Sequence, residues 1–145
     1  LIKLEEKYKL DNTETLSVFS SRIQKLKNKL RSMLANYKKQ GKTIAGFGAA
    51  RSGTTLITQM GIGKMLDFIV DDNLEKQGKF TPGDHILVKP TSTIYEKKPD
   101  YLFILAWIHA KKIMRENKKY IDEGGHFIIC FPEIKVIGKK EINKI

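Results

Sequence analysis

A glycine-rich segment at residues 46–53 holds the residue types best suited to binding a ligand. It follows an apolar stretch that predicts a buried strand, and it leads into a stretch with helical periodicity. Glycines at such a turn let the backbone approach a diphosphate closely, and the first turn of the helix offers free N–H groups at the positive end of its dipole. The sequence therefore predicts a phosphate- and nucleotide-binding turn formed by Gly46, Gly48, Ala49, Ala50, Arg51, Ser52 and Gly53. The same glycines are also compatible with a purely structural role, the close packing of the helix against the sheet.

Three known nucleotide motifs each fail in this segment at a position that can be named. The dinucleotide fingerprint G-x-G-x-x-G requires glycine at position 51, where the sequence has Arg51. The ATP-binding P-loop requires lysine at position 54, where the sequence has Thr54. The methyl-donor turn of methyltransferases usually has an acidic residue just before its glycines, and residues 43–45 contain none. Because an arginine at a helix start can itself pair with a phosphate, the pattern favours a substrate nucleotide over a bound cofactor.

Four further side chains are expected at the same edge of the sheet. Asp71 and Asp72 follow a predicted strand, where an open α/β sheet places a carboxylate against a ribose hydroxyl. Trp107 and His109 follow another strand, where an indole can stack on a base or sugar and an imidazole can bond to a hydroxyl or phosphate. These four residues are the candidates for ribose or sugar binding. Each pair has a structural alternative, because the aspartates suit a plain turn, whereas Trp107 and His109 suit the end of the core and the start of a helix.

We assign no catalytic residue and no metal ligand. The sequence does not indicate a nucleophile with a base and an orienting group, or a pair of carboxylates of the hydrolytic type. His126 and Cys130 have a spacing that suits a metal, but they fall in a predicted buried strand and lack further ligands. The chain is therefore not expected to be catalytically competent on its own.

The elements that must position these residues alternate between apolar strands and helices. Five stretches predict strands, at residues 43–47, 65–70, 85–88, 101–107 and 126–131. Two stretches predict the principal helices between them, at residues 51–60 and 110–121. Continuous apolar strands alternating with helices indicate a parallel sheet that is covered on both faces. The predicted fold class is α/β, with a Rossmann-like open parallel sheet of about five strands.

A long amphipathic helix is predicted ahead of this sheet, at residues 12–40. Its apolar residues recur every three or four positions from Leu16 to Tyr37, and Gly41 is suited to end it. We expect this helix to pack on the domain or on a neighbouring domain, with oligomerisation through the helix as an alternative. Because the sequence begins at Leu1 without an initiator methionine, we expect it to be part of a longer protein. The predicted organisation is an N-terminal helical segment at 1–41, a Rossmann-like domain at 42–137 and a polar tail at 138–145.

The net charge of +11 over 145 residues raises the question of a nucleic-acid partner. The charge is concentrated on the flanks, with a net +6 in residues 1–40, +1 in 41–110 and +4 in 111–145. Aromatic residues do not alternate with the basic ones as they do on surfaces that stack bases, so no specific nucleic acid is expected. There is no apolar run of membrane-helix length, no signal-peptide core at the N-terminus and one cysteine, Cys130. These features predict a cytoplasmic protein without a membrane partner.

Five blocks of the sequence resemble the C-terminal domain of bacterial C-methyltransferases that act on nucleotide-linked deoxysugars. They lie at residues 44–49, 70–86, 98–107, 124–128 and 132–133. The resemblance implies a Rossmann-like domain that helps to hold the nucleotide-sugar substrate. It also implies a zinc-binding module and an S-adenosylmethionine-binding catalytic domain, and this sequence has neither the cysteine cluster nor the methyl-donor motif of those parts. S-adenosylmethionine and the catalytic base are thus expected in an upstream methyltransferase domain of the same protein, and no cofactor is assigned to this chain.

The sequence departs from the family pattern at two places in the candidate site. Ser52 and Thr54 stand where the family usually has lysine and asparagine, and Arg51 places the positive charge one residue earlier. Ile108 and His109 stand where the family tends to have asparagine and an aromatic residue. Phosphate binding through Arg51 is compatible with these changes, but the family's sugar and base specificity is not carried over. The alternatives are a stand-alone Rossmann NAD(P)-binding protein, against which Arg51 argues, and a non-catalytic interaction module that assembles through the N-terminal helix.

Overall fold

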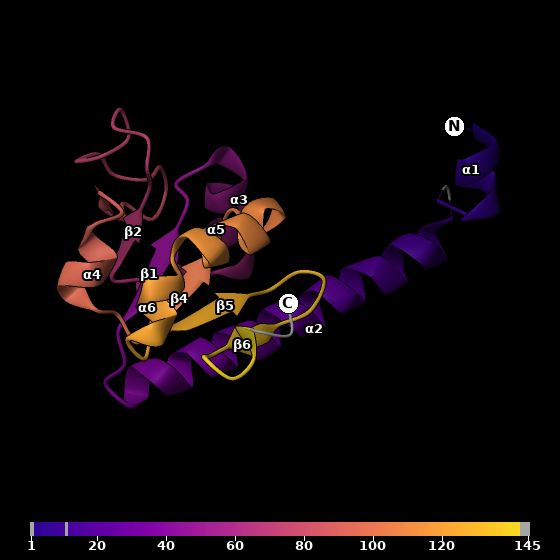
Figure 1. Ribbon diagram of the computed structural model, residues 1–145. Helices are drawn as coiled ribbons and strands as arrows, with labels where there is room; N and C mark the ends of the chain where they lie inside the picture. The colour runs from indigo at the N-terminus through magenta and orange to yellow at the C-terminus, as the bar shows by residue number, and fades with distance from the viewer. Residues whose placement is uncertain (1, 11, 143–145) are drawn as a thin grey trace.

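The computed structural model describes residues 2–10 and 12–142, and it places helices on both faces of one six-stranded sheet (Figure 1). The strands are β1 (Ile44–Phe47), β2 (Phe68–Val70), β3 (Val88–Lys89), β4 (Tyr101–Ile104), β5 (His126–Ile129) and β6 (Lys135–Ile137). The helices are α1 (Ile2–Lys7), α2 (Thr13–Lys39), α3 (Arg51–Met60), α4 (Thr93–Lys97), α5 (Ala110–Glu116) and α6 (Lys118–Asp122), with short 3-10 turns η1 (Gly63–Met65) and η2 (Trp107–His109). The order across the sheet is β3-β2-β1-β4-β5-β6, and every pair is parallel except β5 with β6.

The predicted Rossmann-like α/β fold is confirmed, with differences in detail. The sixth strand, β6, pairs antiparallel with β5, and it was not predicted because its residues run from exposed to buried and do not form a continuous apolar stretch. The helix predicted at 110–121 is divided at Asn117, where α5 passes into α6. The buried Asn117 amide donates to the Ile113 carbonyl and accepts a hydrogen bond from the Tyr95 hydroxyl, and both bonds anchor the chain at this junction.

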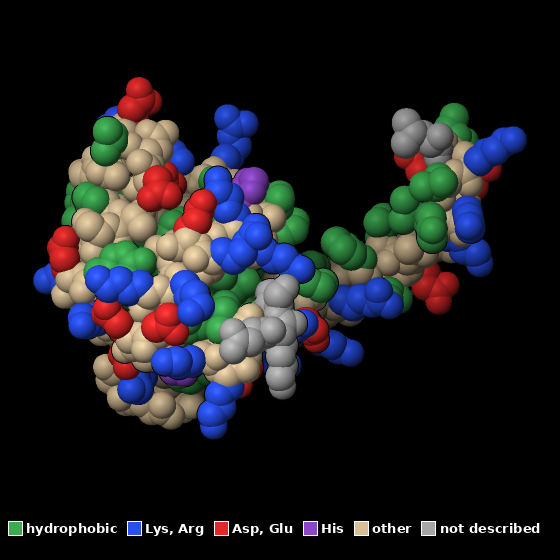
Figure 2. All heavy atoms as spheres, viewed as in Figure 1, with side chains coloured by type: hydrophobic (Ala, Val, Ile, Leu, Met, Phe, Trp, Pro, Cys, Tyr) green, Lys and Arg blue, Asp and Glu red, His purple; other side chains and the backbone are tan. Residues whose placement is uncertain are grey.

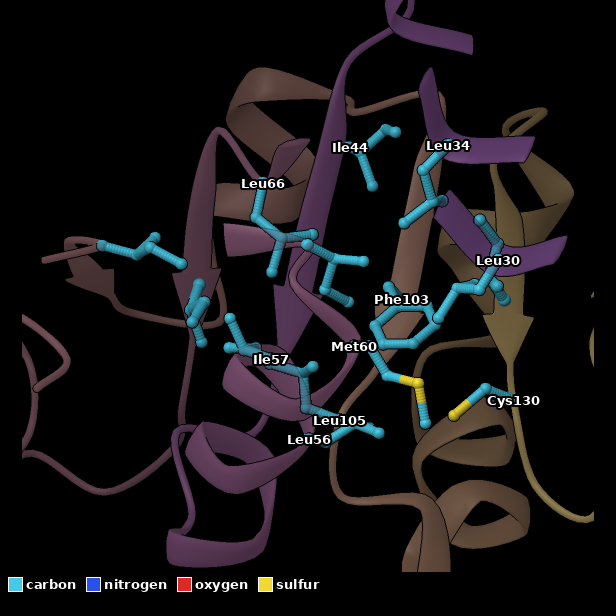
Figure 3. Packing of buried hydrophobic residues seen from close by; sticks show 14 residues of the cluster. Leu30, Leu34, Ile44, Leu56, Ile57, Met60, Leu66, Phe103, Leu105 and Cys130 are labelled. Atoms are coloured by element: carbon cyan, nitrogen blue, oxygen red, sulfur yellow. The ribbon is translucent and has the colours of Figure 1, made fainter. Parts of the chain in front are cut away.

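Alternate side chains of the strands enter two hydrophobic cores, one on each face of the sheet. The first core lies under α2 and α3, and the second lies under α4, α5 and α6. In β4, for example, Phe103 belongs to the first core, whereas Leu102 and Ile104 belong to the second. Figure 3 shows the first core, in which Leu30 and Leu34 of α2 point toward Phe103. Burial on both faces is the reason that the strands read as continuous apolar runs in the sequence.

The long helix α2 has two unlike halves. Its C-terminal half lies on the sheet, where Leu30 and Leu34 are completely buried, and Lys38 Nζ donates to Asp67 at 2.7 Å near its end. Its N-terminal half extends away from the domain and leads back to α1 at its far end (Figure 1). None of the described helices combines the length and the apolar composition of a membrane span.

Part of the segment predicted as a polar tail is folded onto the domain. The Gly138 N–H donates to Glu141 Oε2 at 3.0 Å, and Ile142 packs against the second core. Residues 143–145 lie outside the described residues.

The carboxylate of Asp100 anchors the start of β1 to the start of β4. It accepts hydrogen bonds from Lys42 Nζ and from the N–H and hydroxyl of Thr43, each at 2.9 Å. Burial of this carboxyl acts to raise its pKa, but the hydrogen bonds from Thr43 and Lys42 outweigh that effect and lower the pKa from 3.8 to about 2. Asp100 therefore remains ionised well into the acid range.

We expect Asp100→Asn to remove part of the acid sensitivity of folding. Because the folded state lowers the pKa, ionised Asp100 stabilises the fold fully above about pH 4 and loses this contribution as the pH falls toward 2. The side chain is 35% exposed, so solvent screening limits the contribution to about 1 kcal/mol. Urea unfolding between pH 6 and pH 2 should show a flatter decline of the free energy of unfolding below pH 4 in Asp100→Asn. The control Asp122→Asn, which disturbs only exposed ion pairs, should retain the original decline, and a variant of Asp100 that also retained it would contradict the assignment.

Candidate functional site

The candidate site lies where the winding of the sheet reverses, at the carboxyl ends of β1 and β4. From β1 the chain passes through α3 to β2 and β3 on one side, whereas β4 leads to β5 on the other. Open α/β sheets bind ligands in the crevice at such a reversal, because the loops that follow the two strands diverge there. The crevice is bordered by the glycine-rich turn after β1, by residues 71–87 after β2 and by η2 after β4.

Close packing accounts for all three glycines of the turn. Gly48 has a φ of +98°, and a Cβ at this position would lie 2.7 Å from Ala106 Cβ. A Cβ at Gly53 would lie 2.8 Å from the carbonyl oxygen of Gly48, and one at Gly46 would lie 2.7 Å from the Leu105 side chain. The structural role of these glycines is thus observed, and their contribution to phosphate binding stays a prediction.

The helix that follows the turn, α3, begins without a side-chain cap among the described residues. Ala50 is the N-cap residue in an extended conformation, and its methyl group cannot accept a hydrogen bond. An α-helix leaves the N–H groups of its first turn without internal partners, so those at Arg51 and Ser52 are available to a ligand. Both side chains are exposed. A cation, free N–H groups and the positive end of a helix dipole are together suited to an anion.

Asp71, predicted as a ribose contact, is buried and bonded within the chain. Its Oδ2 atom accepts hydrogen bonds from the N–H of Ala49 at 2.7 Å and from Lys76 Nζ at 3.1 Å, and its Oδ1 atom accepts one from the Asn73 N–H at 2.9 Å. The Asp71 carbonyl also accepts a bond from Gln77 Nε2 at 2.9 Å. Asp71 therefore ties the glycine-rich turn to the loop after β2 and occupies one N–H group of the predicted phosphate cradle.

The other three predicted sugar or ribose contacts are exposed. Asp72 accepts a hydrogen bond from the Thr91 hydroxyl, and Trp107 and His109 lie on η2 after β4. The Trp107 ring packs against Phe131, with the ring centroids 5.4 Å apart. The ligand roles of Asp72, Trp107 and His109 stay predictions.

Two hollows flank the start of α3. The first, which we call the apolar groove, has a volume of about 540 Å³. It is lined by Ile23 of α2, Leu56 and Met60 of α3, Trp107, Phe131, Arg51 and Ser52. The structure thereby brings three predicted site residues, Arg51, Ser52 and Trp107, to the same groove. Ile23 and Phe131 belong to it as well, and no signal in the sequence places them beside the turn.

The second hollow lies on the β2 side of the turn, and we call it the basic hollow. Its volume is about 330 Å³, and its lining includes two lysines, Lys76 and Lys79, against one carboxylate, Glu75. Ala49, Thr54 and the exposed ring of Phe80 also line it. The sequence pattern did not single out the two lysines or Phe80 as contacts. The signal available for them was the block at residues 70–86, which carries the family resemblance.

The described residues do not supply an obvious nucleophile. Cys130 is completely buried, and burial raises the pKa of its thiol to about 12, so the reactive thiolate is not formed near neutral pH. No three His, Cys, Asp or Glu side chains in the described part of the chain come together as metal ligands.

Comparison with known proteins gives a family match and a curated relative. The family described as C-methyltransferase C-terminal domain matches residues 1–132. C-methyltransferase NovU from Streptomyces niveus is 32% identical over 120 residues, a match that covers 82% of this chain and 29% of NovU. The chain thus spans less than a third of that relative's length. Among solved structures, UDP-D-quinovosamine 4-dehydrogenase from Vibrio fischeri aligns with a TM-score of 0.48 at 14% identity, over 70% of this chain and 97% of that one.

Proposed function

We propose that this chain, which belongs to the family of C-methyltransferase C-terminal domains, holds the nucleotide-linked sugar substrate of an S-adenosylmethionine-dependent sugar C-methyltransferase. The observation that carries the proposal is the uncapped start of α3, with Arg51 beside it, at the reversal point of the sheet. The methyl donor and the catalytic base belong to an upstream domain in this proposal, and the protein acts in the cytoplasm. The chain alone then binds substrate without methylating it.

The diphosphate of the substrate is placed at the start of α3. The N–H groups of Arg51 and Ser52 donate to its oxygens, and the Arg51 guanidinium supplies a charged partner. The Ala49 N–H is already bonded to Asp71, so the phosphate is held by the helix start rather than by the whole turn.

The two ends of the substrate extend in opposite directions from the diphosphate. The basic hollow suits the nucleoside, because the exposed Phe80 ring offers a stacking face and Asp72 lies on the same loop for a ribose hydroxyl. The sugar then extends toward Trp107 and His109. Holding the sugar in one orientation at the mouth of the crevice accelerates transfer by removing the entropy cost of bringing the reactants together.

The environment of Asp71 disfavours the alternative of a stand-alone NAD(P)-binding protein. In dinucleotide sites the carboxylate after the second strand bonds to the adenosine ribose. Here that carboxylate bonds to Ala49, Asn73 and Lys76, and an arginine stands at the third glycine position of the fingerprint. Binding of NAD(H) is therefore expected to be much weaker than binding of a nucleoside diphosphate.

Arg51→Ala tests the placement of the diphosphate. We expect it to weaken the binding of dTDP or another nucleoside diphosphate by about 10- to 100-fold, because a charged hydrogen bond to phosphate contributes about 1.5–3 kcal/mol. Isothermal titration calorimetry of the folded chain measures the change. Arg115→Ala, which removes the same charge from an exposed position on α5, is the control and should bind as the unaltered chain does.

Three results of this titration would contradict the proposal. Equal affinities of Arg51→Ala and Arg115→Ala would place the phosphate away from the start of α3. Tight binding of NAD(H) without binding of nucleoside diphosphates would favour the dinucleotide-binding alternative. The absence of binding to any of the nucleotides would favour an interaction module.

A further inference from the structure

The projecting half of α2 carries an apolar stripe whose two outer residues are exposed in the described structure. We call Leu16, Phe19 and Ile23 the α2 stripe; they recur at three- and four-residue spacing and so lie on one face of the helix. The same face continues to Leu30 and Leu34, which are completely buried in the first core. The side chains on this face are therefore completely buried at the C-terminal half of the helix and exposed at its N-terminal half, where Leu16 is 53% and Phe19 is 63% exposed.

The α2 stripe is continuous with the apolar groove beside α3. Ile23 belongs to both, and the groove adds Met60, Trp107 and Phe131 to the same apolar surface. Figure 2 shows hydrophobic side chains along the projecting helix, away from the body of the domain. Contiguous exposed apolar surface of this kind marks an interaction site rather than ordinary scattered surface residues.

We infer that the α2 stripe and the apolar groove are the docking surface for the methyltransferase domain that precedes this domain in proteins of the family. The inference rests on the proposed function. The family is one of C-terminal domains, and the match leaves more than two thirds of NovU outside it. In such a protein the preceding polypeptide joins at α1, which lies at the far end of the projecting helix (Figure 1). A domain that enters there is adjacent to the stripe without any long connection.

The charges of α2 argue against a second copy of the chain as the occupant. The helix contains seven lysines and arginines and a single acidic residue, Glu14. Lys27 follows Ile23 by four residues on the same face, and Arg22 borders Ile23, so two copies packed in parallel along the stripe would bring like charges together. An occupant with an apolar face and an acidic rim fits this surface better.

Docking at this surface places the preceding domain next to the bound substrate. Trp107 and Arg51 line the groove that would be covered, and they are the predicted contacts for the sugar and the diphosphate. The site of methyl transfer then lies at the junction of the two domains, and covering the groove excludes water from it.

Hydrogen exchange of a fused protein tests the inference. The part of NovU outside the match is placed ahead of the complete 145-residue chain, since a covalent link favours docking even when the pairing is imperfect. The backbone amides of residues 14–24 should exchange at least about tenfold more slowly in the fused protein than in the chain alone, because docking suppresses local unfolding of the projecting helix. The amides around Leu30 and Leu34 should not change, because these residues are buried in both proteins.

A matched pair of variants locates the contact. Phe19→Asp in the fused protein should restore fast exchange over residues 14–24. Val18→Asp should not, because Val18 is similarly exposed, at 48%, but lies about 100° around the helix from Phe19. Fast exchange in the fused protein itself, or equal effects of the two variants, would overturn the inference.

Two further measurements distinguish docking of the preceding domain from self-association and from substrate binding. If the chain alone shows the protection and sediments as a dimer that Phe19→Asp dissociates, a second copy is the occupant and the inference is wrong. Nucleotide binding is measured on the chain alone with Arg51→Ala, so a failure of docking and a failure of substrate binding are recorded by different experiments.

Discussion

Replacing Asp71 by alanine is expected to lower the free energy of unfolding by about 2–4 kcal/mol. The substitution removes the acceptor for the N–H groups of Ala49 and Asn73 and for Lys76 Nζ. Each lost hydrogen bond costs about 1 kcal/mol, and a buried N–H group left without a partner costs more. Urea unfolding measures the difference. Asp72→Ala is the matched control, because that side chain is exposed and accepts one bond, from Thr91, so its cost should stay below about 1 kcal/mol.

Asp71→Asn separates the negative charge from the hydrogen bonding. The amide retains one oxygen acceptor but loses the charge that pairs with Lys76. Its NH₂ group is itself a donor, so it cannot accept the hydrogen bonds that the second carboxylate oxygen accepts. We expect a stability between those of the unaltered chain and Asp71→Ala. Nucleoside diphosphate affinity should fall in Asp71→Ala, because the turn that positions the start of α3 loses its anchor. If Asp71→Ala were no less stable than Asp72→Ala, the bonds seen here would not hold the turn.

Asp71 also shows what the spacing of residues does not predict. Its position after β2 correctly places it at the edge of the sheet where ligands bind. Whether a carboxylate there faces a ribose or the neighbouring turn depends on the path of residues 71–77, which follows from several weak local bonds rather than from one pattern. The exposed Asp72 is one residue further along, and the two side chains have opposite surroundings.

Elements with strong local signals were predicted closely. Helix α3 begins and ends as expected. The glycine-rich turn marks its start, and Gly61, in a left-handed conformation, ends it. The resemblance to the C-methyltransferase C-terminal domains is confirmed by the family match, which extends over residues 1–132 and thus includes α1 and α2. Four strands were predicted too long, because apolar residues such as Leu105 continue into the core beyond the end of the strand. The strand predicted at residues 85–88 overlaps β3 only at Val88.

The two hollows of the site depend on contacts between distant parts of the chain. The apolar groove joins Ile23 to Phe131, and no local pattern relates residues so far apart in sequence. Ile23 was placed correctly on the apolar seam of the long helix, but periodicity alone does not say where along that seam the domain stops covering it. The structure places that limit between Leu30, which is buried, and Phe19, which is not, and this boundary is what makes the α2 stripe an interaction surface.

Gly48→Ala is expected to be the most disruptive single-methyl change in the candidate site, at about 2–5 kcal/mol. Two costs combine. A φ of +98° is unfavourable for alanine by about 1–2 kcal/mol, and the new methyl group would lie 2.7 Å from Ala106 Cβ, an overlap that costs a further 1–3 kcal/mol. Ala106 N would be only 3.3 Å away, so the backbone after β4 must move as well. Because that segment leads into Trp107, the shift should also weaken nucleotide binding.

Gly78→Ala isolates the conformational part of this cost. Gly78 also has a positive φ, of +75°, but a Cβ there would have nothing within 4 Å, so only the backbone strain of about 1–2 kcal/mol should appear. The double variant Gly48→Ala with Ala106→Gly removes the overlapping methyl group and should recover part of the loss, giving a favourable coupling energy in a double-mutant cycle. Urea unfolding of the four variants provides the comparison. If Gly48→Ala costs no more than Gly78→Ala, or if Ala106→Gly gives no recovery, the close approach of the turn to β4 does not constrain position 48, and the positive φ alone accounts for the cost of the substitution.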